Sequence, residues 1–420
     1  MLHSTRYLVF LLLVSTCHTA LAQRDSVLIS LADAEIIFFS NNLSLLAGRY
    51  NIDINLAKAE QAAYWDNPVL NTDQSIYDGK FFRHNASFGQ VYVQLQQVIK
   101  TAGKRNKLVR LANDEVMGAR QQFTDLLRNL RFVLRNDFST LNLQFKTLAI
   151  YRSELEALGK LSAGMDAQLK AGNISQKDNL RVKALLYSLQ SDIAGLAGEI
   201  ADTEKEFAVL LQVSGDTVFI PRRQDSVSVA VNFSLPALLD SASHNRPDIQ
   251  LAKTNLQSQQ HNLSYQKALA TPDVTIGIEY DQRSSYINDF WGLGISLPIP
   301  VLNRNKGNIK AAGAGALVAA VQVQQAQNTV QQDVIAAYHK LVNLLQLQQA
   351  ISPDFIPRYN QLMKNMVQSY QDRQVSLLEF IDFFGAYNDA VTRQLQQQTN
   401  LRNAVEELNY STGTTLINLK

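Results

Sequence analysis

The clearest pattern of hydrophobic and polar residues lies between positions 289 and 298. Bulky apolar residues occupy every second position, with only glycine and serine between them from 292 to 296. This period of two predicts a β-strand whose apolar side carries Trp291, Leu293, Ile295 and Leu297. Pro298 and Pro300 end the strand because proline cannot donate to a sheet ladder. A polar turn and a long helical pattern follow directly.

Three other segments predict strands, at 69–78, 87–98 and 273–281, although the first has a weak pattern. Their opposite faces carry mainly Thr, Gly, Gln and Glu. The apolar faces would carry Val91, Val93 and Leu95 in one strand, and Val274, Ile276 and Ile278 in another.

Long helices follow each pair of strands. Apolar residues recur at three- and four-residue steps over 104–170 without any proline, which predicts one helix of about 100 Å. Gly172 fits just past a helix end, and Ser175 can cap a return helix over 176–213.

A second helical pair is expected over 304–371 and 377–409. Pro353 and Pro357 should kink or interrupt the first of these helices, because each removes an intrahelical hydrogen bond.

The plan of helix, two strands and two long helices occurs twice. Asn245, Pro272 and Gly307 each stand 204 positions after Asn41, Pro68 and Gly103. The expected organisation is a first repeat at 23–213, a linker at 214–234, a second repeat at 235–412 and a tail at 413–420. The fold class is thus mostly α-helical with membrane β-strands.

Residues 1–22 are typical of a signal peptide, with Arg6 before an apolar core and a small-residue cleavage site at 20–22. A transmembrane anchor is the alternative, but the apolar run is shorter than about 18 residues. Cys17, the only cysteine, lies in this segment. A loose lipoprotein-like box at 14–17 leaves lipidation of Cys17 as an alternative to its removal.

Charge and motifs exclude several classes of function. The formal net charge of +2 gives no reason to expect nucleic acid as a partner. The histidines of the mature chain show no metal-ligand spacing, and neither a nucleophile elbow nor a phosphate loop is present. We therefore expect no catalytic residue, metal site or cofactor.

Each strand has about ten residues, which is enough to span a bilayer. A soluble four-stranded sheet with one buried face is the alternative. An open sheet in lipid would leave edge backbone groups unpaired, so several copies would have to pool strands in a closed barrel. Two copies would give about eight strands and a barrel filled by side chains, whereas three would leave room for water.

At this point the chain resembles the TolC-like outer-membrane efflux proteins, and more closely the shorter branch that works with heavy-metal and cation pumps. The resemblance covers nearly the whole mature chain. It rests on the duplicated plan, on Gly103-Lys104-Arg105, on Asn245-Arg246-Pro247-Asp248-Ile249, and on the motif from Leu297 to Asn308. It implies a homotrimer with a twelve-stranded barrel in the outer membrane. It also implies a helical barrel that crosses the periplasm to a periplasmic adaptor and an inner-membrane pump of the RND type.

The resemblance further implies a gate at the second helical turn, where Glu379 and Asp382 match acidic residues that ring the family's periplasmic entrance. They lie three residues apart and so share one helix face. A ring of such carboxylates would favour cations. Arg373 stands where the family has glycine, and it could pair with either acid. Two solvated surface acids are the alternative.

The adaptor would dock beside both turns, around Gly172, Asn173, Ser175, Gln374, Val375 and Ser376. Ordinary turn chemistry is the alternative there, and it accounts fully for Gly172.

The expected function is a passive export duct in the outer membrane, driven by a partner pump, with metal cations as the favoured cargo. Drugs or other small molecules are the alternative cargo. A soluble, exported coiled-coil scaffold or a periplasmic adaptor is the alternative of another class, but it gives no reason for two pairs of one-sided strands.

Overall fold

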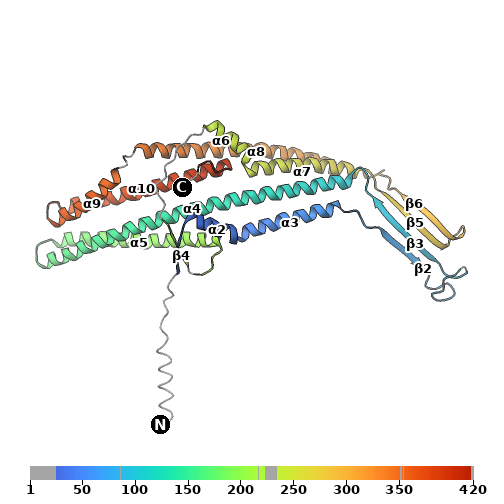
Figure 1. The fold of residues 1–420 in the computed structure, drawn as a ribbon, viewed down its shortest axis with the longest axis horizontal. Coiled ribbons are helices and arrows are strands. Elements are labelled where there is room, and N and C mark those ends of the chain that lie inside the picture. Colours follow the sequence, from blue (N-terminus) through green and yellow to red (C-terminus); the bar gives the residue numbers. More distant parts are fainter. Residues whose placement is uncertain are drawn as a thin grey trace, which may run out of the picture.

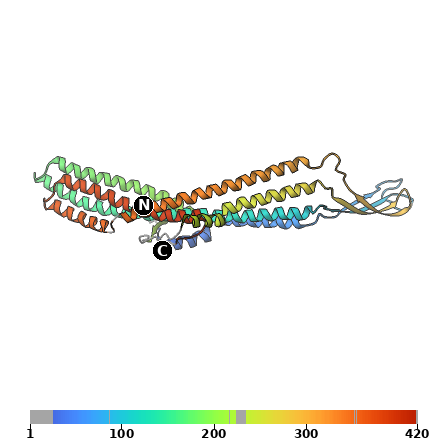
Figure 2. The ribbon, with the colours of Figure 1, turned by 90° about the horizontal axis from the view of Figure 1, so that it is seen from above.

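The computed structural model describes residues 25–85, 87–215, 217–222, 234–350, 352 and 354–417. The predicted signal peptide with Cys17, much of the predicted linker and Pro353 lie outside these residues. The molecule is elongated, with a sheet at one end, the turns of two helical hairpins at the other, and long helices between them (Figures 1 and 2).

The longest element is α4 (Lys104–Lys170), which runs from the sheet to the far turns without interruption. Its 67 residues span about 100 Å at 1.5 Å per residue. Gly103, with a positive φ of 66°, precedes it. The antiparallel helix α5 (Gln176–Leu211) packs along it. Its bounds are close to the 176–213 expected from the sequence.

The second long pair is interrupted. α8 (Lys306–Ala350) ends before the far turn, and α9 (Phe355–Gln371) continues after a break, with Pro357 in its first turn. Proline is tolerated there because the first amides of a helix have no intrahelical partner. The helical stretch expected over 304–371, with a kink or an interruption at its prolines, is therefore interrupted and forms two helices. α10 (Leu377–Thr412) returns from the turn and packs against α4, α8 and α9.

Four antiparallel strands form the sheet, in the order β2-β3-β5-β6. Their bounds are Val69–Gln74 for β2, Val91–Ile99 for β3, Val274–Arg283 for β5 and Asn288–Ser296 for β6. β3 and β5 pair along the middle of the sheet, although 175 residues of sequence separate Ile99 from Val274. The two predicted strand pairs thus share one sheet.

Three strand ends fall two or more residues short of the expected ranges. β2 is shorter than 69–78 because the chain enters a compact loop in which Tyr77 bridges to Phe81. β3 begins at 91 rather than 87, after Gly89, whose positive φ of 72° breaks the extended chain. β6 ends at Ser296, so Leu297 lies outside the strand.

The helices next to the sheet form a layer whose order follows that of the strands. α3 (Leu43–Ala63) packs on α4, α4 on α7 (Pro247–Leu269), and α7 on α8 (Figure 2). Within the described residues this layer does not close on itself. Its two outer helices expose apolar side chains: Leu43, Leu46, Tyr50 and Ile54 on α3, and Leu317, Val318 and Val321 on α8.

Four short elements near the middle of the molecule were not predicted. They are β1 (Asp25–Ile29), α2 (Leu31–Asn41), β4 (Thr217–Pro221) and α6 (Leu235–Asn245). β1 and β4 pair in parallel. The lead before α3 and the expected linker at 214–234 therefore both contribute regular structure, because each supplies the partner that the other lacks.

Buried apolar clusters hold the helices together at two levels. Phe138 on α4 and Phe207 on α5 pack in the middle cluster with β1, α2 and β4. Leu158, Phe380 and Phe384 belong to a separate cluster near the far turns, where the two hairpins meet. The relative position of the two turns is thus fixed by packing and not by the turns alone.

Candidate functional site

One face of the sheet is apolar and largely exposed. The register places Leu95 opposite Ile278 and Ile278 opposite Leu293, so these side chains form one row across three strands. Leu293 is 69% and Ile295 70% exposed. Nine of the ten predicted lipid-facing residues share this face within the strands: Val91, Val93, Leu95, Val274, Ile276, Ile278, Trp291, Leu293 and Ile295. Leu297 is exposed beyond the end of β6.

The opposite face of the sheet is polar. Gln94 on β3 lies opposite Glu279 on β5, and Glu279 lies opposite Gly292 on β6. The carboxylate of Glu279 accepts hydrogen bonds from the Tyr92 hydroxyl at 2.7 Å and from Gln94 at 3.1 Å. The sheet therefore separates an apolar surface from a polar one across its whole width.

The base of the sheet is tied to α4. Asp273, just before β5, accepts a hydrogen bond from the backbone of Thr101 at 2.8 Å and an ion pair from Lys104 at 2.7 Å. Lys104 is buried. Gly103-Lys104-Arg105, one of the motifs that carried the resemblance, thus supplies the joint between strand and helix.

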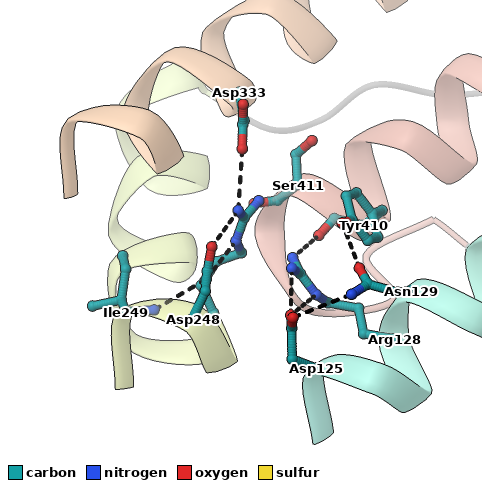
Figure 3. Close-up of polar contacts among 9 residues, drawn as sticks. Asp125, Arg128, Asn129, Asp248, Ile249, Asp333, Tyr410 and Ser411 are labelled. Atoms are coloured by element: carbon teal, nitrogen blue, oxygen red, sulfur yellow. Dashed lines mark hydrogen bonds and ion pairs between the residues drawn. The ribbon is translucent and has the colours of Figure 1, made fainter. Parts of the chain in front are cut away.

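A polar cluster clamps the C-terminal end of α10 to α4, α7 and α8 (Figure 3). Arg246, which is 3% exposed, pairs with Asp248 at 2.7 Å and Asp333 at 3.1 Å, and donates to the Ser411 carbonyl. Burial would raise the pKa of Asp248, but hydrogen bonds and charge from Arg246 hold it below its ordinary value.

The other side of this clamp comes from α4. Arg128 pairs with Asp125 at 2.6 Å and donates to the carbonyl of Tyr410. The Tyr410 hydroxyl donates to Asn129. The motif Asn245-Arg246-Pro247-Asp248-Ile249 is therefore a structural clamp, and the arrangement offers no reactive group.

The first far turn, between α4 and α5, has a glycine-terminated helix end. Gly172 has a φ of 71°, and the Asn173 amide donates to the Gln168 carbonyl. Ser175 caps α5 by accepting from the Asp178 amide at 3.1 Å. Turn chemistry accounts for all three predicted residues of this turn.

The second turn, between α9 and α10, repeats this geometry with a different residue. Arg373 occupies the position of Gly172 with a φ of 58°, and the Gln374 amide donates to the Ser369 carbonyl. The departure from glycine thus leaves the turn geometry unchanged and places a bulky residue in a left-handed conformation. Within the described residues Arg373 forms no ion pair with Glu379 or Asp382, a pairing that the sequence left open.

Glu379 has a local role that the sequence analysis missed. It forms a capping box with Ser376, accepting from the Ser376 amide at 2.8 Å while the Ser376 hydroxyl accepts from the Glu379 amide. The Ser376 amide and hydroxyl hold the pKa of Glu379 below its ordinary value. The Ser-x-x-Glu spacing was the available signal. Asp382 is exposed on the same helix.

A groove of about 470 Å³ lies between the two turns. Asn173 from the first turn and Arg373 and Val375 from the second line it, together with Tyr370. Gly172, Ser175, Gln374 and Ser376 are not among its lining residues. The structure therefore brings together two of the six predicted docking residues, Asn173 and Val375, with Arg373 of the predicted gate.

Sequence reasoning also missed a buried acid on α4. Glu154 is 7% exposed, and neither of its carboxylate oxygens has a hydrogen-bond partner. The side-chain oxygen of Asn388 on α10 likewise has none. Burial raises the pKa of Glu154 to about 7, against a smaller opposing effect of Asn388. The signal for the burial of Glu154 was its place four residues before Leu158, in the row of apolar residues that recur at three- and four-residue steps along this helix.

Among the described residues, no group of three or more His, Cys, Asp or Glu side chains could hold a metal ion. The helices of the described ranges include none with the length and apolar character needed to cross a membrane.

Comparison with known proteins adds to this geometry. Residues 238–414 match the family model described as outer membrane efflux protein. The cobalt-zinc-cadmium resistance protein CzcC of Cupriavidus metallidurans is 20% identical over 65% of this chain and 63% of its own length. The cation efflux system protein CusC of Escherichia coli is 24% identical over 64% of this chain and 60% of its own length. Both alignments thus span less than two thirds of the relative.

A solved structure of CusC has the same fold, with a TM-score of 0.75 at 18% identity over 95% of this chain and 96% of that chain. The open one-sided sheet on a long helical body is therefore the fold of a TolC-like channel subunit. Residues 238–414 are thus similar to the outer membrane efflux protein family, and both named relatives align with about two thirds of this chain. The matched family is described as an outer membrane protein, and the solved CusC structure is described as forming a transmembrane channel.

Proposed function

We propose that this chain is the subunit of a passive export duct that three copies form in the outer membrane. The observation that carries the proposal is the open sheet, with an exposed apolar face, a polar face, and free edges at β2 and β6 within the described residues. In lipid those edges must be paired, because an unpaired backbone group there costs several kcal/mol. Pairing β6 of one copy with β2 of the next closes the sheet.

The helical layer supports the same assembly. Its outer helices α3 and α8 continue along the long axis of the molecule from the sheet edges at β2 and β6, and both expose apolar side chains. Joining copies edge to edge would bury these two sets of side chains against each other and continue the barrel below the membrane. Three copies give about twelve strands, which leaves room for water, whereas two would give a barrel filled by side chains. The matching order of elements also supports internal duplication, with repeats at 23–213 and 235–412.

The test is the native mass of the mature protein, extracted in detergent from the outer-membrane fraction. A mass near three chains supports the duct, with conductance in planar bilayers as the second measurement. A monomer recovered from the soluble periplasm would instead favour the coiled-coil scaffold or adaptor.

We propose metal cations as the cargo because the names of both aligned relatives specify cobalt, zinc and cadmium resistance or cation efflux. The energy would come from an inner-membrane pump of the RND type. Deleting the protein should then lower the tolerated concentration of divalent metals, and the wild-type chain should restore it. Loss of tolerance to drugs with unchanged metal tolerance would favour the alternative cargo.

The far turns are proposed as the periplasmic entrance and the docking site of a periplasmic adaptor. The groove between them, lined by Asn173, Arg373 and Val375, offers both polar and apolar contacts. Glu379 and Asp382, exposed on α10, would supply the acidic ring.

The gate assignment needs a test that spares the capping box. Glu379→Gln keeps the cap, because glutamine serves at the same position, but removes the charge. Combined with Asp382→Asn, it should weaken block by divalent cations. Glu379→Ala, which also loses the cap, serves as the comparison for damage to the turn. Unchanged cation block in the glutamine–asparagine double variant would exclude the ring.

A further inference from the structure

Glu279 is the one acid in the central row of the sheet's polar face, and the chain is built around it. The row runs across the four strands from Asn71 and Gln94 through Glu279 to Gly292. A Cβ atom at position 292 would lie only 2.7 Å from a carboxylate oxygen of Glu279. Glycine at 292 therefore leaves the space in which the carboxylate rests across β6.

Two donors fix the carboxylate in this space. The Tyr92 hydroxyl and the Gln94 amide, at 2.7 and 3.1 Å, both donate to the same oxygen of Glu279. Neither donor carries a charge. Within the described residues no lysine or arginine pairs with Glu279, in contrast to Asp78 further out, which pairs with Arg283 at 3.0 Å. The negative charge of Glu279 is thus held in place without being neutralised.

We propose that Glu279 gives the barrel section of the duct its own preference for cations, separate from any acidic ring at the far turns. The inference rests on the proposed function, which places the polar face around water. Threefold symmetry would then set three carboxylates at one height in the lumen. Because lipid on the outer side excludes water, their fields concentrate in the lumen, attract cations and repel anions.

The test measures local electrostatics rather than current, so a closed entrance does not interfere. Gln96→Cys places a thiol on the polar face in the next row of the sheet, opposite Gly277. Its reaction rates with a cationic trimethylammonium-ethyl and an anionic sulfonatoethyl methanethiosulfonate are compared in outer-membrane vesicles. Cys17 is either removed or lipidated under both expectations for the leader, and the parent chain provides the blank.

Glu279→Gln keeps the size of the side chain and an oxygen that can accept from Tyr92. This substitution should lower the ratio of cationic to anionic reaction rates about two-fold or more. The estimate assumes that one to three Glu279 carboxylates lie within roughly a Debye length, about 8 Å, of the thiol. The matched control is Asp289→Asn. Asp289 accepts from Tyr280, which lies on the apolar face, so removing its charge should leave the ratio unchanged.

The outcomes separate this inference from the proposed function. If the thiol introduced at position 96 reacts, but its rate ratio is unaffected by Glu279→Gln or equally affected by Asp289→Asn, the inference is overturned and the duct is left intact. If that thiol reacts with neither reagent, the polar face meets no water, and both the inference and the duct are overturned.

Discussion

Neutralising Glu154 should remove a pH-dependent weakness between α4 and α10. Its pKa is raised from 4.5 to about 7 in the folded chain, so the protonated form is the one that the fold favours. The contribution of this group to stability is therefore fully present below pH 4.5 and is lost as the pH rises through about 7. At about 1.4 kcal/mol per pH unit, the loss amounts to about 3 kcal/mol, of which roughly 2.5 kcal/mol falls between pH 5 and 8.5.

The structural reason is that the Glu154 carboxylate is buried, which raises its pKa more than the Asn388 side chain lowers it. The protonated form buries no charge, whereas the ionised form places a charge where burial removes it from water. Glu154→Gln supplies an amide donor at every pH. The variant should therefore gain about 2.5 kcal/mol relative to wild type on going from pH 5 to 8.5.

Hydrogen exchange of the α4 and α10 amides around these residues, measured for both proteins at both pH values, reports this difference. Glu156→Gln is the matched control. Glu156 is exposed two residues away, and its bond to Lys160 holds its pKa below the ordinary value, so it stays ionised across this range. A difference below about 0.5 kcal/mol for Glu154→Gln would refute the argument that this carboxyl is buried and unpartnered.

Three further sets of substitutions test other parts of the structure. Arg373→Gly should stabilise the second turn by about 1 kcal/mol, because glycine adopts the left-handed conformation without strain, and amide exchange in that turn should become slower. Gly172→Ala should destabilise the first turn by about the same amount, and amide exchange there should become faster. Arg246→Ala should lower the free energy of unfolding by about 2–3 kcal/mol, which is less than for a fully buried ion pair because its two acid partners are partly exposed. A thermal melt in detergent that matches wild type would contradict the clamp. Leu293→Arg should block assembly in the outer membrane, at about 2–4 kcal/mol in each copy. Gln96→Glu on the polar face, opposite Gly277, should still assemble. Normal insertion of the Leu293 variant would mean that this face does not meet lipid.

The long helices and the one-sided strands were predictable because their signals are local and repeated. The β1–β4 pair, which the sequence analysis did not predict, shows the limit of such local signals. Asp25–Ile29 pairs with Thr217–Pro221 across most of the first repeat, and neither segment is long enough to identify itself. At the second turn, the sequence analysis names both Ser376 and Glu379 but misses the hydrogen bonds between them. Glu379 was considered as a gate residue, although Ser376 three positions earlier already indicated a cap.

The buried acid could not be predicted for a different reason. A helical stripe indicates that Glu154 is on a packed side of α4, but not which helix covers it or whether that helix offers a donor. Its missing partner depends on how α10 lies against α4, which only the folded chain determines.

The break between α8 and α9 makes the subunit mechanically asymmetric. α4 carries a displacement of the first turn directly to the joint at Lys104 and Asp273, and so to the sheet. On the other side α8 stops at Ala350, and only α10 continues past the break. A pull on the second turn therefore has two routes: through α10 to the arginine clamp, or sideways through the cluster of Leu158, Phe380 and Phe384 into α4. The first turn is thus connected to the sheet by one continuous helix, whereas the second depends for that connection on its packing against the first hairpin.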